Sequence, residues 1–264
     1  GKAPVSGVFP FGGDMKHRPE NAPGSFRVYE PKPGPELSEE NARYLGGVLR
    51  LRPGDVFLIT DGVEQEFTAV FQGKRACTIG ASTRPGREAE QVVVLFPALT
   101  KGDSMEWVIE KGIELGVTRI VPVISQHCVV RESGRGKIER WRKIAVTAML
   151  QCGGCRLPEV LEPIPLALLP KPGADVRALL LHEKLVESGE SSPVGEPAKM
   201  DFSTGRGALP REHWILSGPE GGFSDDEVGQ LLAAGWVSRW LGPRRLRAET
   251  APLAALSALL LGQW

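Results

Sequence analysis

The stretch Leu216-Ser-Gly-Pro-Glu-Gly-Gly-Phe-Ser224 decides the fold class of this chain, because it joins a buried strand directly to a capped helix. The apolar run over Trp214–Ser217 predicts the strand, and Ser224 with Glu227 predicts a capping box at the start of the helix. Three glycines in the turn permit sharp bends and expose backbone amides to a ligand. Ligands of open α/β sheets bind where strands end, so we interpret this turn as one wall of a binding site.

Two further strand ends supply the other walls. The segment Leu241-Gly-Pro-Arg-Arg-Leu-Arg-Ala-Glu-Thr-Ala251 also runs from a strand to a helix, and its three arginines are opposed only by Glu249. The segment Leu179-Leu-Leu-His-Glu183 ends another buried strand with His182, which we expect to line the pocket rather than to act as a base. Loops that follow adjacent parallel strands meet at one edge of the sheet, so the three segments predict one pocket.

From about residue 89 onward the sequence alternates strands and helices, which predicts a mainly parallel sheet with helices on both faces. The expected strands are Gln91–Leu99, Arg119–Val123, Ala178–Leu181, Trp214–Ser217 and Val237–Leu241. Four helices are expected. The first begins at a capping box of Asp103 and Glu106, and the second runs over Lys137–Gln151. The third follows Ser224 and ends near Gly235, and the fourth extends from Pro252 to Leu261.

The chain before residue 89 has a different pattern. Short alternating stretches separated by turn formers predict a small barrel-like β domain; they are Phe26–Tyr29, Asp55–Thr60, Phe67–Gln72 and Ala76–Ala81. One helix is expected over Glu39–Leu49, led by Ser38. Residues 1–24 predict a flexible arm, and the polar segment 187–212 predicts a flexible excursion. The expected organisation is therefore an arm at 1–24, a β domain at 25–88 and an α/β domain at 89–264.

The composition excludes several classes of protein. A chain of 264 residues with 41% hydrophobic residues can bury a large core, which argues against disorder and against a small disulfide scaffold. Its 32 basic residues equal its 32 acidic residues, so any binding to nucleic acid must use a local patch. Neither a GxGxxG nor a GxxxxGK[ST] motif supports dinucleotide or nucleoside triphosphate binding. Four cysteines, apolar runs too short for a membrane helix and no signal-like start predict a soluble cytoplasmic protein.

The motif Cys152-Gly-Gly-Cys155 raises the alternative of redox or zinc chemistry. A redox pair should open a helix after a strand, whereas this pair closes a helix and lacks the stabilising amino-terminal dipole. His127 and Cys128 would have to complete a zinc site, but they form an irregular pair rather than a second ligand knuckle. We therefore expect no metal, and a redox or zinc protein is the third interpretation.

Positive charge gathers in local clusters. Between Arg131 and Lys143 six basic residues face two acidic ones, a pattern usual for a solvated helix face. Arg43, Arg50 and Arg52 lie near the helix of the β domain and its following turn, where they are placed to grip phosphates. The complete set of expected RNA contacts is Arg43, Arg50, Arg52, Lys101, Arg131, Arg244 and Arg245.

Taken together, these segments resemble the 16S ribosomal RNA uridine-N3 methyltransferase family, which belongs to the knotted SPOUT class of S-adenosylmethionine enzymes. The matching segments run in the family's order over almost the whole chain beyond residue 25. They are Leu49-Arg-Leu-Arg-Pro-Gly-Asp55, Lys101–Val117, Gln151-Cys-Gly153 with Arg156 and Pro158, Gly218–Ser224 and Leu241–Ala251. The chain departs from the family at Tyr44 and Gly47, where a His and an Arg are common.

The resemblance implies a PUA-like β domain followed by a SPOUT domain, an α/β knot whose last strand and helix thread a deep trefoil knot. It also implies a homodimer, with S-adenosyl-L-methionine held in the knot. Carried over by position, the cofactor-binding residues are Leu181, His182, Gly218, Pro219, Glu220, Gly221, Gly222, Leu241, Gly242, Leu246, Arg247 and Thr250.

The implied reaction is methylation of N3 of one uridine, uridine 1498 in the family, in 16S ribosomal RNA of the small subunit. Loss of the N3 proton puts negative charge on the uracil carbonyl oxygens, and we expect Arg247 to stabilise that charge. Glu220 is the candidate base or orienting group, with Glu249 behind it. The alternatives are a SPOUT methyltransferase acting on another position of ribosomal or transfer RNA, and a non-catalytic RNA-binding module.

Overall fold

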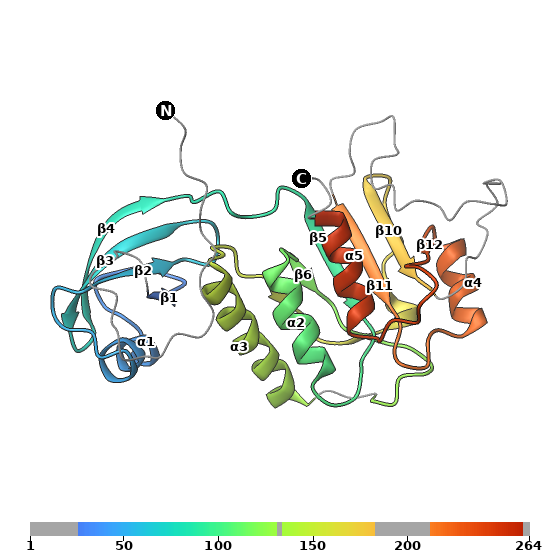
Figure 1. Ribbon diagram of the computed structural model, residues 1–264, viewed down its shortest axis with the longest axis horizontal. Coiled ribbons are helices and arrows are strands. Elements are labelled where there is room, and N and C mark those ends of the chain that lie inside the picture. Colours follow the sequence, from blue (N-terminus) through green and yellow to red (C-terminus); the bar gives the residue numbers. More distant parts are fainter. Residues whose placement is uncertain (1–25, 131–133, 183–211, 261–264) are drawn as a thin grey trace.

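The computed structural model describes residues 26–130, 134–182 and 212–260, which form two bodies arranged along the long axis of the molecule (Figure 1). Each body has its own buried hydrophobic cluster: one includes Phe57 and Ile59, and the other includes Leu95 and Ile215. The predicted arm at 1–24 and nearly all of the predicted excursion at 187–212 lie outside the described residues.

The first body is a four-stranded sheet in the order β1-β2-β3-β4. Its strands are β1 (Arg27–Tyr29), β2 (Val56–Thr60), β3 (Glu66–Gly73) and β4 (Ala76–Thr83). β1 runs parallel to β2, and the other two pairs are antiparallel. Phe57 and Ile59 on β2 and Ala69 and Phe71 on β3 point inward at every second position, as the alternating sequence predicts.

The second body is built on a six-stranded sheet in the order β12-β10-β11-β5-β6-β8, in which every neighbouring pair is parallel. Its strands are β5 (Val92–Pro97), β6 (Arg119–Ile120), β8 (Glu159–Val160), β10 (Val176–Leu181), β11 (Glu212–Ser217) and β12 (Val237–Arg239). A separate parallel pair joins β7 (Val123–Ile124) to β9 (Ile164–Pro165). The parallel α/β architecture expected from the sequence is confirmed, and the threading of a trefoil knot stays a prediction.

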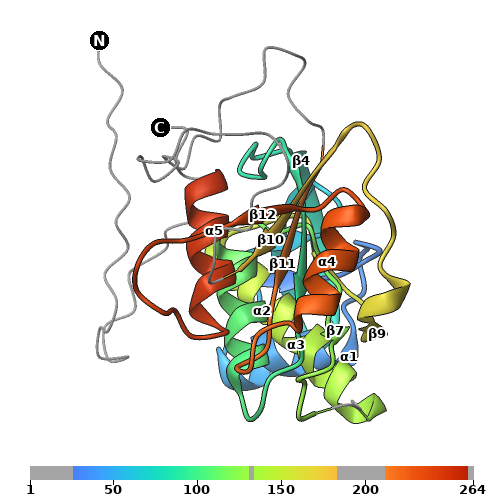
Figure 2. The same cartoon turned by 90° about the vertical axis from the view of Figure 1, so that its right-hand side faces the viewer.

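Helices cover both faces of this sheet. They are α2 (Ser104–Glu114), α3 (Arg135–Cys152), α4 (Asp225–Ala233) and α5 (Thr250–Leu260), with a short 3-10 turn at η2 (Leu166–Leu168). α2 contacts both α3 and α5, and Figure 2 shows α5 and α4 on opposite sides of the sheet. Among the described residues, no helix is long and apolar enough to cross a bilayer.

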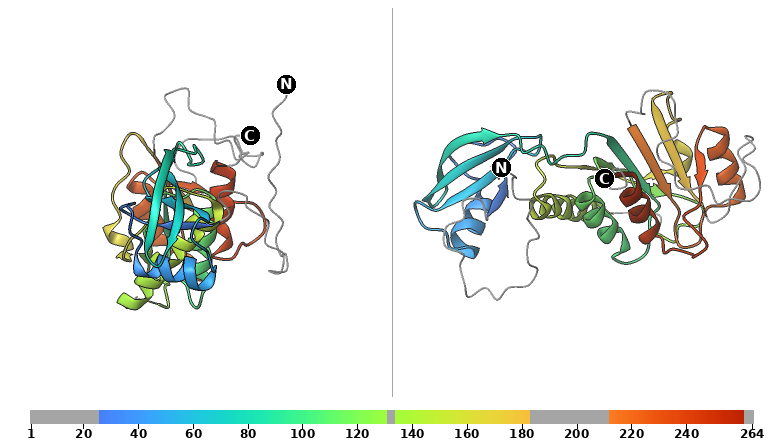
Figure 3. Two further views of the ribbon diagram at one scale, coloured as in Figure 1. Left: turned by 90° about the vertical axis from the view of Figure 1, so that its left-hand side faces the viewer. Right: turned by 45° about the horizontal axis from the view of Figure 1, so that its top comes forward.

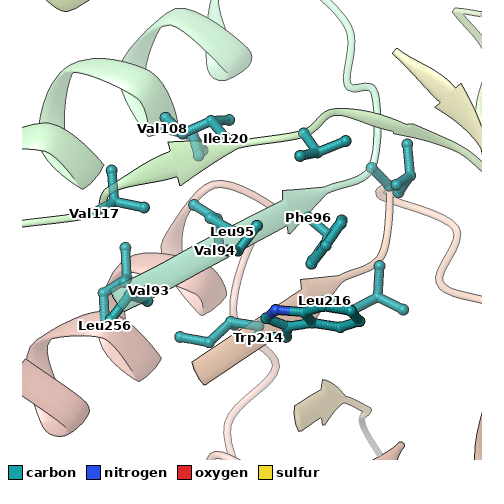
Figure 4. Packing of buried hydrophobic residues seen from close by; sticks show 14 of the residues in the cluster. Val93, Val94, Leu95, Phe96, Val108, Val117, Ile120, Trp214, Leu216 and Leu256 are labelled. Atoms are coloured by element: carbon teal, nitrogen blue, oxygen red, sulfur yellow. The ribbon is translucent and has the colours of Figure 1, made fainter. Parts of the chain in front are cut away.

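The core of the second body surrounds the central strand β5. Figure 4 shows Val93 and Leu95 of this strand among side chains from α2, α5, β6 and β11. Phe96 lies edge-on to Trp214, with ring centroids 5.4 Å apart. Burial of large apolar side chains such as these, at about 1.5–3 kcal/mol each, fixes the strands whose ends form the site described below.

A polar junction joins the two bodies. The Leu157 amide donates to the Gly62 carbonyl at 2.8 Å, and the Thr60 hydroxyl donates to the Cys155 carbonyl at 3.2 Å. Arg156 and Glu64 form an ion pair across the same boundary. The segment 155–157, which follows α3, therefore rests on the end of β2 and on the β2–β3 turn.

Glu66 is the ionic centre of this junction. Its Oε2 lies 2.6 Å from Arg27 Nη2 and 3.0 Å from Arg87 Nη2. The Cys155 thiol is 3.9 Å from the same oxygen. Arg27 and Glu66 are both largely buried, so separating them would leave buried charges uncompensated, whereas Arg87 is partly exposed to solvent.

Several local expectations need correction. The helix expected over Glu39–Leu49 ends as an α-helix at Arg43 (α1, Glu39–Arg43) and continues as the π-helical turn η1 (Tyr44–Val48), which contains two glycines. The strand expected over Arg119–Val123 is divided at Pro122, which has no amide to donate to a ladder.

The remaining corrections concern helix starts. Asp103 precedes α2 but makes no side-chain capping bond, and its φ of −95° and ψ of 3° lie outside the extended conformation usual for an N-cap. The Glu106 side chain, which would complete a capping box, pairs with Arg140 at 2.7 Å. α3 begins at Arg135, two residues earlier than expected, and α5 begins at Thr250, earlier than the expected Pro252 by the same number. In contrast, the capping box of Ser224 and Glu227 at α4 and the cap of Ser38 at α1 are both confirmed.

Candidate active site

A cleft of about 820 Å³ opens at the carboxyl ends of β10, β11 and β12. Its walls are the three segments singled out in the sequence: the end of β10 at Leu181–His182, the glycine loop at Ser217–Phe223, and the arginine loop at Trp240–Glu249. Parallel pairing of Leu181 with Ser217 and with Arg239 sets these strand ends side by side. A cleft of this size accommodates a cofactor or another small molecule.

The glycine loop turns tightly between β11 and α4. The Gly222 amide donates to the Pro219 carbonyl at 2.9 Å, and Gly222 has a φ of +70° that favours glycine. Ser224 then caps α4, with its backbone amide donating to Glu227 at 2.9 Å. These bonds give the loop one defined shape before any ligand enters.

The arginine loop is more open. Gly242 has a φ of +113°, and the Thr250 amide donates to the Arg247 carbonyl where α5 begins. The Arg247 side chain is 86% exposed, and its Nη1 lies 3.9 Å from Glu249 Oε1. A contact this long at the surface restrains the guanidinium weakly, so Arg247 is free to turn toward a bound substrate.

Glu220, in the glycine loop, contacts the loop that follows β5. Its Oε1 accepts a hydrogen bond from the Lys101 backbone amide at 3.2 Å, although the two residues are 119 positions apart. Parallel pairing of β11 with β5 places the two loops at the same edge. The Lys101 amide thus orients the candidate base.

The structure brings together almost all of the residues predicted to bind a cofactor. All of them line the cleft except Thr250, which is the first residue of α5 just beyond it. The candidate catalytic residues Arg247 and Glu220 are both in the lining. Sequence reasoning missed two lining residues outright, Ser104 and Trp240. Within the predicted wall segments it did not single out five others, namely Ser217, Phe223, Pro243, Ala248 and Ala251.

Ser217 is the most informative of the missed residues. It is 2% exposed, and within the described residues its hydroxyl has no hydrogen-bond partner. A buried hydroxyl without a partner costs roughly 1–3 kcal/mol, which a polar ligand atom in the cleft would offset. The available signal was its place directly before Gly218, a polar residue at the end of an apolar strand.

The predicted RNA contacts divide into two groups. Arg244 and Arg245 line the cleft, and Lys101 lies beside it through the Glu220 contact. Arg43 and Arg52 are exposed on the first body, and Arg50 has a φ of +56° there. The right-hand view of Figure 3 shows α1 (blue) and the strands β10 and β11 (yellow to orange), whose ends line the cleft, in opposite halves of the molecule. Arg131 lies outside the described residues.

The cysteine motif is part of the junction between the bodies. Cys152 ends α3, Gly153 follows with a φ of +82°, and Cys155 is buried beside Glu66. Burial, and then the Glu66 carboxylate, raise the pKa of the Cys155 thiol, which works against thiolate chemistry. No group of three or more His, Cys, Asp or Glu side chains among the described residues is arranged to hold a metal.

Each of the two bodies matches a family model of RNA methyltransferases. A family model described as an RNA methyltransferase domain matches residues 87–260, and one described as an RNA methyltransferase PUA domain matches residues 37–80. The Ribosomal RNA small subunit methyltransferase E of Bacillus subtilis is 33% identical over 240 residues, which is 87% of this chain and 91% of that protein.

Solved structures extend the likeness to the fold. A Ribosomal RNA small subunit methyltransferase E from Neisseria gonorrhoeae, bound to S-adenosyl methionine, has a TM-score of 0.76 and 30% identity, and the match covers 90% of this chain and 97% of that one. A methyltransferase from Legionella pneumophila, in complex with the bound cofactor SAM, has a TM-score of 0.75 and 31% identity with the same coverage.

Proposed function

This chain belongs to the Ribosomal RNA small subunit methyltransferase E family, and from that membership we propose that it transfers a methyl group from S-adenosylmethionine to N3 of one uridine in 16S ribosomal RNA. The observation that carries the proposal is the cleft, in which the glycine loop and the arginine loop face each other across strand ends. The family membership and the mainly parallel fold agree with the resemblance drawn from the sequence.

The cofactor fits the glycine-loop side of the cleft. Backbone groups of Gly218–Gly222 and Leu241–Gly242 form walls without bulky side chains, and the buried Ser217 hydroxyl offers a polar partner. S-adenosylmethionine supplies an electrophilic methyl group: the N3 lone pair forms the new N–C bond as the S–C electron pair returns to sulfur. The walls supply alignment of donor and acceptor, which lowers the entropic part of the barrier.

The remaining chemistry belongs to two side chains at the cleft. N3 of uracil must lose its proton, and Glu220, oriented by the Lys101 amide, is the group in the cleft that we assign as its acceptor. The negative charge that develops on the uracil carbonyl oxygens requires a cation, which we assign to Arg247. The exposure of Arg247 suits this role, because the guanidinium turns onto the base once the RNA arrives.

RNA binding in this proposal uses both bodies. Arg244 and Arg245 meet the target nucleotide at the cleft, which must be unpaired because N3 lies on the Watson–Crick edge. The PUA domain, proposed to span residues 25–88, holds a second part of the RNA through Arg43, Arg50 and Arg52. The proposal also includes a homodimer, the small subunit as the substrate and a cytoplasmic location, where ribosomal RNA is modified.

The testing experiment incubates the purified chain and labelled S-adenosylmethionine with unmodified small ribosomal subunits and, separately, with naked 16S RNA. Mass spectrometry then maps any methylated nucleotide. N3-methyluridine at one position, expected at uridine 1498, supports the proposal and identifies the preferred substrate. Cofactor binding without methyl transfer to either RNA refutes this target and favours another RNA. Absence of cofactor binding refutes the enzyme assignment and favours an RNA-binding module.

A further inference from the structure

A turn outside the cleft supports the glycine loop from behind. It consists of residues 125–128, which follow β7, and it contacts the first turn of α4 through Gln126 and the glycine loop through His127. The Gln126 amide donates to Glu227 Oε1 at 2.7 Å, so the turn engages the carboxylate that also caps α4. His127 Nδ1 lies 3.2 Å from the Gly222 carbonyl oxygen. A carbonyl oxygen only accepts hydrogen bonds, so the imidazole donates through Nδ1–H.

This turn is itself fixed by Cys128. The Ser125 amide donates to the Cys128 sulfur at 3.3 Å, and the Ser125 hydroxyl lies at 3.3 Å from the same sulfur. Both Ser125 and Cys128 are buried, and the thiol also reaches toward the Val123 carbonyl at 3.8 Å. The cysteine that the sequence offered as a metal ligand thus closes the turn. His127 therefore projects from a fixed base.

The backbone of the glycine loop packs closely on the same histidine. A Cβ built on Gly221 would lie 3.2 Å from the Cβ of His127, which is tighter than an ordinary contact. The loop at Gly221 is therefore held at its closest approach to the turn by packing, and at Gly222 by the imidazole hydrogen bond. His127 is not among the residues that line the cleft. Any influence that it has on a ligand is transmitted through the loop.

We propose that His127 is a positioning residue, which holds the peptide groups of Gly221 and Gly222 in the geometry that binds the cofactor. The inference rests on the proposed function, since it concerns S-adenosylmethionine in the same cleft. This role requires an N–H donor and does not require a positive charge on the ring, because Nδ1–H is present both in the imidazolium and in one tautomer of the neutral imidazole. A side chain that offers N–H at the same place should therefore replace it.

Four variants test the proposal by isothermal titration with S-adenosylmethionine. His127→Ala and His127→Phe remove the donor, and His127→Asn keeps an N–H close to the Nδ1 position. Val129→Ala is the matched control, since Val129 is 65% exposed and two residues along the chain. We expect the Kd to rise about three- to tenfold for the Ala and Phe variants, because each loses one hydrogen bond. For the Asn variant and the Val129 control, the Kd should stay within about twofold of the wild-type value. The melting temperature without cofactor should be the same for all four, because His127 is exposed.

The steady-state constants provide a second readout. A loop that is misplaced without loss of a reacting group raises KM for S-adenosylmethionine and leaves kcat nearly unchanged. Equal Kd values for the Asn and Phe variants, or wild-type affinity in all of them, overturn the proposal. A fall in melting temperature shared by all three His127 variants also overturns it, because the role is then structural.

Failure of the proposed function is recognised separately, by wild-type protein that does not bind S-adenosylmethionine. Hydrogen exchange of the Gly222 and Ser224 amides then tests the positioning role without any ligand, since the first is hydrogen-bonded within the loop and the second to Glu227 where α4 begins. Faster exchange in the Ala and Phe variants, restored in the Asn variant, supports it. Unchanged exchange in all variants overturns it.

Discussion

Replacing Glu66 by Gln should destabilise the protein substantially, although the change is isosteric. Glu66 is 11% exposed, and its Oε2 holds Arg27, which is 16% exposed, at 2.6 Å and Arg87, which is 41% exposed, at 3.0 Å. Breaking a fully buried pair costs about 3–5 kcal/mol. The amide oxygen still accepts one hydrogen bond and Arg87 is partly solvated, so we expect a loss of about 2–3 kcal/mol. At about 2–4 °C per kcal/mol, the melting temperature should fall by about 4–12 °C.

Urea denaturation followed by circular dichroism measures this loss, and the chain supplies its own control. Glu36→Gln removes a pair with Arg75 at 3.2 Å whose side chains are 70% and 52% exposed, and it should cost less than about 0.5 kcal/mol. The same Glu66 variant should bind S-adenosylmethionine normally, because the junction lies away from the cleft, and should show a higher KM for the RNA. Equal stability of the two variants would show that Glu66 is not a buried ionic centre and would refute the reasoning.

Three further changes test the site and the core. Arg247→Ala should lower kcat by at least about 100-fold, with the Kd for S-adenosylmethionine within about twofold; a large loss of affinity in calorimetry would instead make Arg247 a cofactor ligand. Gly221→Val should weaken cofactor binding by at least about tenfold, since even a Cβ there meets His127 at 3.2 Å; undiminished affinity in the same titration would contradict the wall assignment. His213 is 3% exposed, and burial, followed by the charge of Arg177, lowers its pKa below the ordinary 6.5. The unfolded chain therefore binds more protons below about pH 6.5, so stability falls as the pH drops, and His213→Leu should reduce the loss of melting temperature between about pH 7.5 and 5.5. An equal loss in both proteins, measured by scanning calorimetry, would exclude His213 as its source.

Much of the site was predictable because its walls are built from backbone. Glycines at a strand end are visible in a sequence, and parallel strands bring such ends together whatever the side chains are, so the cleft could be placed from residues 179–183, 216–224 and 241–251. Contacts between side chains from distant segments could not be predicted in this way. Nothing in the sequence links Lys101 to Glu220 or His127 to Gly222, because each pair meets only after the sheet has formed.

The local expectations that need correction also fail because of contacts between distant segments. A capping box at Asp103 is a reasonable expectation from spacing alone, but the Glu106 side chain pairs with Arg140 of α3, and the sequence does not show that these two helices meet. The sequence predicts that the cysteine motif ends a helix, and α3 confirms it, whereas the place of Cys155 beside Glu66 in the junction depends on a contact between the two bodies. Local patterns predict elements, and contacts between elements then decide which side chains remain available.

The glycine loop and the arginine loop differ in how firmly the surrounding contacts hold them, and on this difference we base the proposal that the first binds the cofactor and the second the RNA. The glycine loop is supported by the Lys101 amide, by His127 and by the capping box of Ser224, so its shape is present before a ligand binds. The Arg247 side chain across the cleft is 86% exposed and only loosely paired. A preformed wall suits a small cofactor, which has little binding energy to spend on ordering a loop. An exposed guanidinium suits the RNA, whose many phosphate contacts can supply that energy. In the reaction that we propose, arrival of the RNA places Arg247 over the uracil as the negative charge develops.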